Sequence, residues 1–337
     1  MKIKFLNLAI ILVAICGMVI VEARAQTRGG KSAPAASSLM TSLPESDAVA
    51  HVKVNQLLSE AMPRMLADNP AKLSEVNAGI DRFKERTGLD PRMFQEVALG
   101  IRYTHPSEGV TKLQTVGLVN GTFSSAAMVA AGRVASNGRY REEKHRDKII
   151  YIFTLEENIK LLGVFDFKIH ELAASPLNNN TLALGDPEGV RAAIDASRQR
   201  KRANGELIAL ASRNPNAVIG FGSNMSEQLV NNLDIGNAPI AADLKTLRQV
   251  YGSVGTTATD LELFIGARAM NAQAAKSFGD TLEGLRQFGS FFVGRISGAR
   301  GVLAKSALNN LKISSDANEL QIRTSVAQAE VGPLLGN

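Results

Sequence analysis

Apolar residues along this chain recur with two different periods, which predicts strands interspersed with helices. Alternation of period two, or a short apolar run bounded by turn residues, is typical of strands. In residues 165–170, for example, Phe165, Phe167 and Ile169 alternate with polar neighbours. By these criteria the first half should contain strands over residues 47–54, 95–103, 113–120, 139–142, 148–153, 165–169 and 181–184.

Helical spacing is clearest in residues 71–86, where the apolar face is formed by Leu73, Val76, Ile80 and Phe83. Gly88 follows, at the place where a glycine commonly ends a helix. We also expect a helix from Asn55 to Leu66 that is kinked or split at Pro63. Further helices should cover residues 124–135 and start at Asp186-Pro187, where an acid and a proline suit the first turn.

The second half repeats much of this order, which suggests an internal duplication. Residues 48–55 match 217–224, each a strand leading to an asparagine placed as a helix cap, and residues 95–97 match 248–250. The best match pairs residues 114–121 with 262–269, each followed by a helix that contains an Ala-Ala pair. The matched segments are offset by roughly 150 residues, and a repeat period of that length is too long for a solenoid. We therefore expect an α+β fold of two tandem modules, each an antiparallel sheet with helices packed on one face.

The first 25 residues have the pattern of a secretory signal peptide. Lys2 and Lys4 precede an apolar run over residues 5–21, and Ala23-Arg24-Ala25 forms a small-x-small cleavage site before Gln26. The alternative is an uncleaved N-terminal membrane anchor, although a span needs roughly 20 apolar residues. Lipidation at Cys16 is disfavoured because Ile15, rather than a small residue, precedes the cysteine.

The expected layout follows from these patterns. Residues 1–25 are the signal peptide, and residues 26–43, rich in small and polar residues, are a flexible spacer. The first module covers residues 44–200 and the second residues 201–337, with the boundary inside the basic stretch 198–214. No later apolar run is long enough to cross a bilayer, so the processed chain should be a soluble extracytoplasmic protein, periplasmic or secreted.

The amino-acid composition argues against several kinds of chemistry and against one class of partner. Cleavage would remove Cys16, the only cysteine, and with it disulfides, thiol catalysis and cysteine-bound zinc. The formal charge of +6 includes a net +2 from Lys2, Lys4, Glu22 and Arg24, so the processed chain carries +4. That mild bias, together with the absence of Trp, argues against nucleic acid as a partner.

Motifs for metals and cofactors are incomplete. His170-Glu171 begins like a zinc-protease helix, but Ala174 stands where the second histidine is needed. His51, His105 and His145 show no ligand spacing. Gly220-Phe221-Gly222 lacks the third glycine of a dinucleotide loop and is better explained as strand positions that allow close packing. We therefore predict neither a metal nor a cofactor, and assign no metal-ligating or cofactor-binding residue.

Paired carboxylates carry no local signature, and each pair has a structural explanation. Glu142/Glu143 suit a charged turn, Glu156/Glu157 an exposed helix start, and Asp186/Glu188 a helix N-terminus. The basic segment 139–148 contains three acids and is explained best as a solvated hairpin tip. No catalytic residue is assigned, so the sequence favours a protein that is not an enzyme.

Three short sequence segments resemble those of a known group of proteins. They are Leu43-Pro44, residues 97–102 and the turn at residues 182–186. The chain resembles exported bacterial proteins of unknown function with a Leu-Pro opening and two related α+β modules, a group that implies architecture but no activity. We expect an extracytoplasmic, non-catalytic binding or scaffold protein for an unidentified envelope component or ligand. The alternatives are a hydrolase with dispersed carboxylates and a carrier of an apolar ligand.

Overall fold

The computed structural model describes residues 37–87, 90–107, 110–154, 159–161, 165–167, 171–198, 202–231, 238–331 and 333. Its strands are β1 (Ala48–Val52), β2 (Phe94–Ser107), β3 (Val110–Gly121), β4 (Tyr140–His145), β5 (Lys148–Thr154), β6 (Ile159–Leu161), β7 (Phe165–Phe167), β8 (Glu171–Asn178), β9 (Thr181–Gly185), β10 (Ala217–Asn224), β11 (Leu247–Thr256), β12 (Asp260–Ala269), β13 (Lys312–Asp316) and β14 (Glu319–Ala327).

The longer helices are α4 (Pro70–Thr87), α5 (Ser125–Ala135), α6 (Pro187–Arg198), α7 (Gly205–Ala211), α9 (Ala238–Lys245), α10 (Ala272–Val293) and α11 (Gly298–Asn310). The shorter ones are η1 (Met40–Ser42), α2 (Val54–Gln56), η2 (Leu57–Ala61), α3 (Met62–Met65), η3 (Pro91–Met93), α8 (Glu227–Asn231) and α12 (Gln328–Val331).

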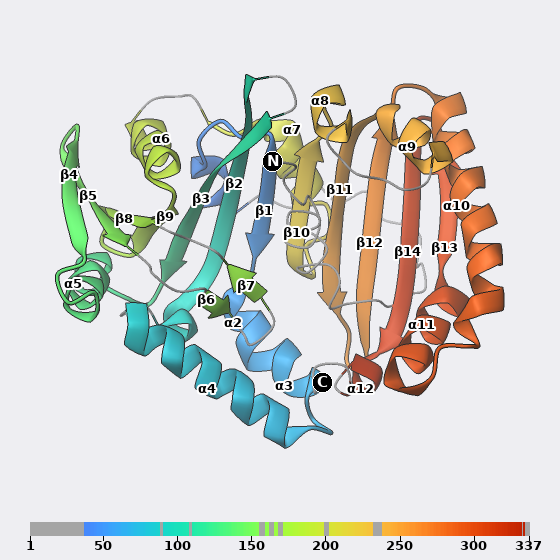
Figure 1. The fold of residues 1–337 in the computed structure, drawn as a ribbon, viewed down its shortest axis with the longest axis horizontal. Helices are drawn as coiled ribbons and strands as arrows, with labels where there is room; N and C mark the ends of the chain where they lie inside the picture. Colours follow the sequence, from blue (N-terminus) through green and yellow to red (C-terminus); the bar gives the residue numbers. More distant parts are fainter. Residues whose placement is uncertain are drawn as a thin grey trace.

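Twelve strands form one antiparallel sheet, in the order β13-β14-β12-β11-β10-β1-β2-β3-β9-β8-β5-β4, and β6 pairs with β7 separately (Figure 1). This confirms the predicted α+β class. The strands of the two predicted modules are continuous across the centre, because β1 pairs with β2 on one side and β10 on the other. Ala50 there lies opposite both Leu99 and Phe221. The duplication itself remains a prediction.

Helices cover both faces of the sheet, more than the single face that we expected. In β3, Leu118 packs in a cluster with Val190 and Ile194 of α6, whereas the next residue, Val119, packs with Met128 of α5. Because neighbouring residues of a strand point to opposite faces, α6 and α5 lie on opposite sides. Consecutive apolar residues in central strands therefore reflect burial on both faces.

In the second half, α10 and α7 likewise lie on opposite faces. Ala275 and Phe278 of α10 pack against Ala267 and Leu320. On the other face, α7 lies against β10 at Gly220, where an added Cβ would be 2.0 Å from the Ala211 carbonyl oxygen. The prediction that the glycines of Gly220-Phe221-Gly222 allow close packing is confirmed.

The prediction of a flexible spacer is wrong for its last residues. Residues 37–43 belong to the packed fold, because Met40 and Leu43 are fully buried. Within the basic stretch 198–214, Arg198 ends α6 and residues 205–211 form α7, where Leu207 is fully buried in the same cluster.

The predicted asparagine caps are also wrong. Lys53 precedes α2, and the Ser226 hydroxyl caps α8 by accepting from the Leu229 amide at 3.1 Å. Pro63 lies in the first turn of α3 and does not split the helical run over residues 54–65, although the hydrogen-bond pattern changes just before it. The turn before it, η2, is a π-helix, which fits the lack of a proline N–H and the clash that its ring makes with the preceding turn.

Several predicted features lie outside the described residues. These are the signal peptide over residues 1–25, spacer residues 26–36, Gly88, the pair Glu156/Glu157, and His170. In the part of the chain that the structure describes, no helix is both long and apolar enough to span a membrane.

Candidate binding site

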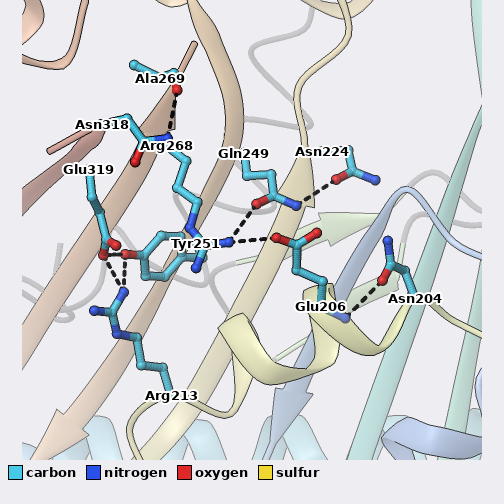
Figure 2. A network of polar contacts seen from close by, with 10 residues as sticks. All are labelled: Asn204, Glu206, Arg213, Asn224, Gln249, Tyr251, Arg268, Ala269, Asn318 and Glu319. Atoms are coloured by element: carbon cyan, nitrogen blue, oxygen red, sulfur yellow. Dashed lines mark hydrogen bonds and ion pairs between the residues drawn. The ribbon is translucent and has the colours of Figure 1, made fainter. Parts of the chain in front are cut away.

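A polar cleft of about 750 Å³ opens where α7 meets β10, β11, β12 and the start of β14 (Figure 2). Five segments far apart in sequence contribute to it. Its lining residues are Glu206, Asn224, Arg248, Gln249, Arg268, Ala269, Met270, Asn318 and Glu319. Almost all of these carry hydrogen-bonding side chains, so the cleft suits a polar ligand.

Tyr251 forms the support beneath this cleft. Its side chain is fully buried, its hydroxyl donates to Glu319, and the Arg213 guanidinium contacts both groups. The Tyr251 ring lies edge-on to Phe264 with centroids 5.7 Å apart, and the Arg213 guanidinium lies 5.2 Å from the Tyr251 centroid. These contacts hold Glu319 at the edge of the cleft.

The ring of Tyr251 extends over Gly266, its partner in β12. A Cβ added at Gly266 would come within 2.2 Å of the ring, so only glycine leaves room for this arrangement. Because Gly266 has no side chain, Tyr251 of β11 can reach across β12 to Glu319 of β14.

Arg268 connects the two sides of the cleft. Its guanidinium donates to Glu206 at 2.7 Å and to Gln249 at 3.1 Å, while the Gln249 amide donates to Asn224 at 3.3 Å. Glu206 lies in the first turn of α7, where a negative side chain interacts favourably with the helix dipole. Asn204 caps the same turn by accepting from the Glu206 amide at 2.9 Å. The wall of the cleft is therefore preorganised.

A β-bulge places Arg248 in the cleft. Leu247 lies opposite Ala269 and Gln249 lies opposite Arg268, so Arg248 is an extra residue in β11. Leu247 packs with the α10 cluster on one face, whereas Arg248 and Gln249 both line the cleft on the other. Bulges commonly redirect a side chain in this way beside functional sites.

Arg248 differs from Arg268, the other cation that lines the cleft, and from Arg213 beneath it. Arg213 and Arg268 both pair with glutamates. Among the residues that the structure describes, the exposed Arg248 side chain makes neither a hydrogen bond nor an ion pair. The bulge thus presents an uncompensated guanidinium to solvent beside a fixed set of polar groups.

A second, smaller cleft of about 280 Å³ lies between α6 and strands β2 and β3. Its charged side chains already have partners. Arg102 faces Glu45 at 3.9 Å, and Asp195 accepts from His145 at 3.0 Å and also from Arg146. Arg146 and His145 belong to the predicted basic hairpin, whose tip therefore docks on α6.

The carboxylate pairs considered as candidates in the sequence do not form a shared site, because each carboxylate contacts a different partner. Glu143 accepts from Arg191 at 2.6 and 2.7 Å, which lowers the pKa of Glu143, while Glu142 faces Arg133 at 3.5 Å. Asp186 instead accepts from the Gly189 amide at 2.8 Å as the expected cap of α6.

Glu171 lies in strand β8 and accepts from Arg141, which lowers the pKa of that carboxyl. In the described part of the chain, no group of three or more histidine or acidic residues is placed to hold a metal ion. His51 and His145 each contact a single carboxylate instead.

One serine, one glutamate and one histidine do converge. Glu96 accepts from the Ser37 hydroxyl and contacts His51 Nε2, both at 2.9 Å. The hydrogen bond from His51 lowers the pKa of Glu96 despite partial burial. A hydrolytic triad needs the histidine between the serine and the acid, so that it can take the serine proton. Here the acid lies in the middle, and the arrangement does not activate Ser37.

The sequence did not point to the cleft. Arg248, Gln249 and Tyr251 look like ordinary members of a strand, and the hydrogen-bond partners of Gln249 and Tyr251 lie between 19 and 68 residues away. One local signal exists, because Tyr is rare in this chain and Tyr251 is flanked by Gly252. That signal indicates close packing but not a binding site.

No family model matches the sequence, and no curated protein matches it either. Similar solved structures include crystal forms III and I of TP0453. Form III has a TM-score of 0.44 and 9% identity, covering 88% of this chain and 96% of that chain. Form I has a TM-score of 0.44 and 10% identity, covering 90% and 98% respectively. Likeness at this level has no bearing on the function.

Proposed function

We propose that this protein is an extracytoplasmic, non-catalytic binding protein whose polar cleft holds a small anionic ligand. The single observation that carries the proposal is Arg248, an unpaired guanidinium that a β-bulge directs into a cleft of fixed polar groups. Export rests on the signal-peptide pattern of residues 1–25. The two-module origin remains part of this proposal.

The chemistry of the lining defines the ligand class. Arg248 supplies donors for a carboxylate or phosphate, and guanidinium groups bind such planar or multivalent acceptors with two parallel hydrogen bonds. Glu206 and Asn318 lie on other sides of the cleft and suit hydroxyl or amide groups on the same ligand. A small polar molecule that carries one anionic group matches this arrangement.

The two alternative functions, a hydrolase and a carrier of an apolar ligand, require different structural features. A hydrolase with dispersed carboxylates needs an acid with a perturbed pKa near a bound substrate. Both acids of the cleft, Glu206 and Glu319, instead face arginines. A carrier of an apolar ligand needs an apolar cavity. The larger cleft is instead lined mainly by polar side chains, and the smaller one mixes charged residues with small apolar ones.

The test is a titration with matched charged and neutral probes. Galacturonate is compared with galactose, an acetylated dipeptide acid with its amide, and inorganic phosphate is added alone. At least one anion should bind measurably more tightly than its neutral analogue. Arg248→Gln should then weaken it about tenfold to a hundredfold, as expected for one charged hydrogen-bonding group.

Arg82→Gln is the matched control, because Arg82 is an exposed arginine on α4 outside the cleft. It removes the same charge but should leave affinity unchanged. Equal losses in the two variants would reduce the effect to overall charge, and no binding by any anion would remove the proposal. Activity profiling with ester, glycoside and peptide substrates tests the hydrolase, and mass spectrometry of co-purifying lipid tests the carrier.

A further inference from the structure

Exposed apolar side chains are concentrated at the C-terminal half of α10 and the start of α11. Of the ten large apolar side chains that are exposed in the described residues, six lie between positions 285 and 302. We call them the α10–α11 surface, namely Leu285, Phe288, Phe291, Phe292, Ile296 and Val302. Phe291 is 76% exposed and Phe288 is 63% exposed. Contiguous exposure of this kind marks an interaction site.

The exposed stripe of the α10–α11 surface continues the side of α10 that carries Phe278, since Leu285 follows Phe278 by seven residues, about two turns. Ala275 and Phe278 are buried against the sheet in the N-terminal half. Leu285, Phe288 and Phe292 follow at spacings of three and four residues, which places them along one side of the helix. The rings of Phe288 and Phe292 lie 4.7 Å apart. The helix α10 lies at the edge of the molecule (Figure 1), and these three side chains are exposed to solvent.

The same stretch of chain is rich in basic residues. Residues 284–315 contain five cations and neither Asp nor Glu; the cations are Arg286, Arg295, Arg300, Lys305 and Lys312. Arg286 is paired with Glu283, which immediately precedes this stretch, at 2.6 Å. The Arg295 guanidinium lies 5.5 Å from the centroid of the Phe292 ring. A cation beside an exposed aromatic ring can keep its charge in a polar layer while the ring enters an apolar one.

We infer that the α10–α11 surface docks on a bilayer that contains anionic phospholipid. Aromatic and aliphatic side chains on one side of a helix, with arginines beside them, form the pattern of a helix that lies in the membrane interface. With Glu283, the partner of Arg286, included, residues 283–315 carry a net charge of +4, which is complementary to anionic head groups and identifies the occupant. This inference rests on a surface separate from the polar cleft and does not depend on the proposed function.

The chain contains no Trp, so a substituted Trp reports its own position. Phe291→Trp in the full chain should show a blue shift of emission when vesicles of phosphatidylglycerol and phosphatidylcholine are added. Brominated lipid in those vesicles should quench it. Val134→Trp is the matched control, because Val134 is 78% exposed on α5. Binding through the N-terminal apolar segment alone would change neither signal.

Charge is tested by Arg295→Gln combined with Arg300→Gln in the Phe291→Trp chain. Each removed cation should weaken binding to the anionic vesicles about fivefold, and added salt should weaken the parent in the same direction. Equal binding to pure phosphatidylcholine, or equal shifts at positions 134 and 291, would overturn the inference. A lipid-free blue shift that rises with protein concentration would instead assign the surface to a second copy of the chain.

Discussion

Gly266→Ala should destabilise the protein strongly, because it removes the space that Tyr251 occupies. The added methyl group would lie 2.2 Å from the Tyr251 ring and 2.5 Å from its hydroxyl oxygen. Tyr251 is fully buried, and its hydroxyl already contacts Glu319 and Arg213. The ring must therefore move, and with it the support of the polar cleft.

Two effects set the magnitude. Overpacking a close-packed core typically costs about 1–3 kcal/mol. Moving the hydroxyl away from Glu319 also weakens a hydrogen bond to a charged group, which contributes about 1.5–3 kcal/mol. We expect the free energy of unfolding to fall by about 3 kcal/mol, since relaxation of the ring relieves part of the clash while it breaks the hydrogen bond.

Gly255→Ala is the matched control on β11. An added Cβ there would meet its nearest atom, a carboxylate oxygen of Glu262, at the ordinary distance of 3.5 Å. This variant should match the wild type or gain about 0.5 kcal/mol, because alanine restricts the unfolded chain. Urea unfolding followed by circular dichroism measures both variants.

A double-mutant cycle tests whether the loss of stability in Gly266→Ala comes from the contact with the Tyr251 ring. In a Tyr251→Leu background the side chain no longer reaches over Gly266, so adding Gly266→Ala should cost less than about 1 kcal/mol. If Gly266→Ala proves as stable as Gly255→Ala, the Tyr251 ring does not depend on the bare backbone of β12. If the cost is unchanged in the Tyr251→Leu background, the clash lies elsewhere.

Two further predictions concern pH and have opposite signs. The pKa of Glu96 is lowered from its ordinary 4.5, mainly by the hydrogen bond from His51, so this carboxylate stabilises the fold above 4.5. Glu96→Gln should lower the urea midpoint at neutral pH, and the deficit should shrink as the pH falls below 4.5. Burial and the neighbouring Asp260 raise the pKa of Glu262, so Glu262→Gln should increase the midpoint at neutral pH and lose that advantage at acidic pH. A deficit at Glu96 or a gain at Glu262 that is constant with pH would contradict the respective assignment.

Local patterns predicted the elements well where each residue's role depends on its neighbours in sequence. The apolar face of α4, the cap at Asp186 and the packing role of Gly220 are of this kind. Met40 and Leu43 were assigned to a spacer because their small and polar neighbours suggest flexibility. Their burial depends on α6 and α7, which lie about 150 residues further along the chain.

The cleft was beyond prediction for a related reason. The β-bulge at Arg248 is defined by the register between β11 and β12, and no local pattern in β11 distinguishes it from regular alternation. Tyr251 and Glu319 meet only because Gly266 lies between them in the sheet. Register and long-range pairing, rather than residue type, create the site.

The arrangement of helices explains why the cleft lies in the second half of the chain. In the first half, α6 follows β9 and covers the face of β3 that carries Leu118. In the second half, α7 reaches β10 and β11 on that side, while α10 packs on the opposite face of β12 and β14. The described segment after β14 is α12, whose four residues span only about 6 Å and pack beside α3 and α11. Polar side chains such as Arg268 and Glu319 therefore occupy the face that α6 covers in the first half. The same sheet thus carries a packed core on one side of β10 and an open polar cleft on the other.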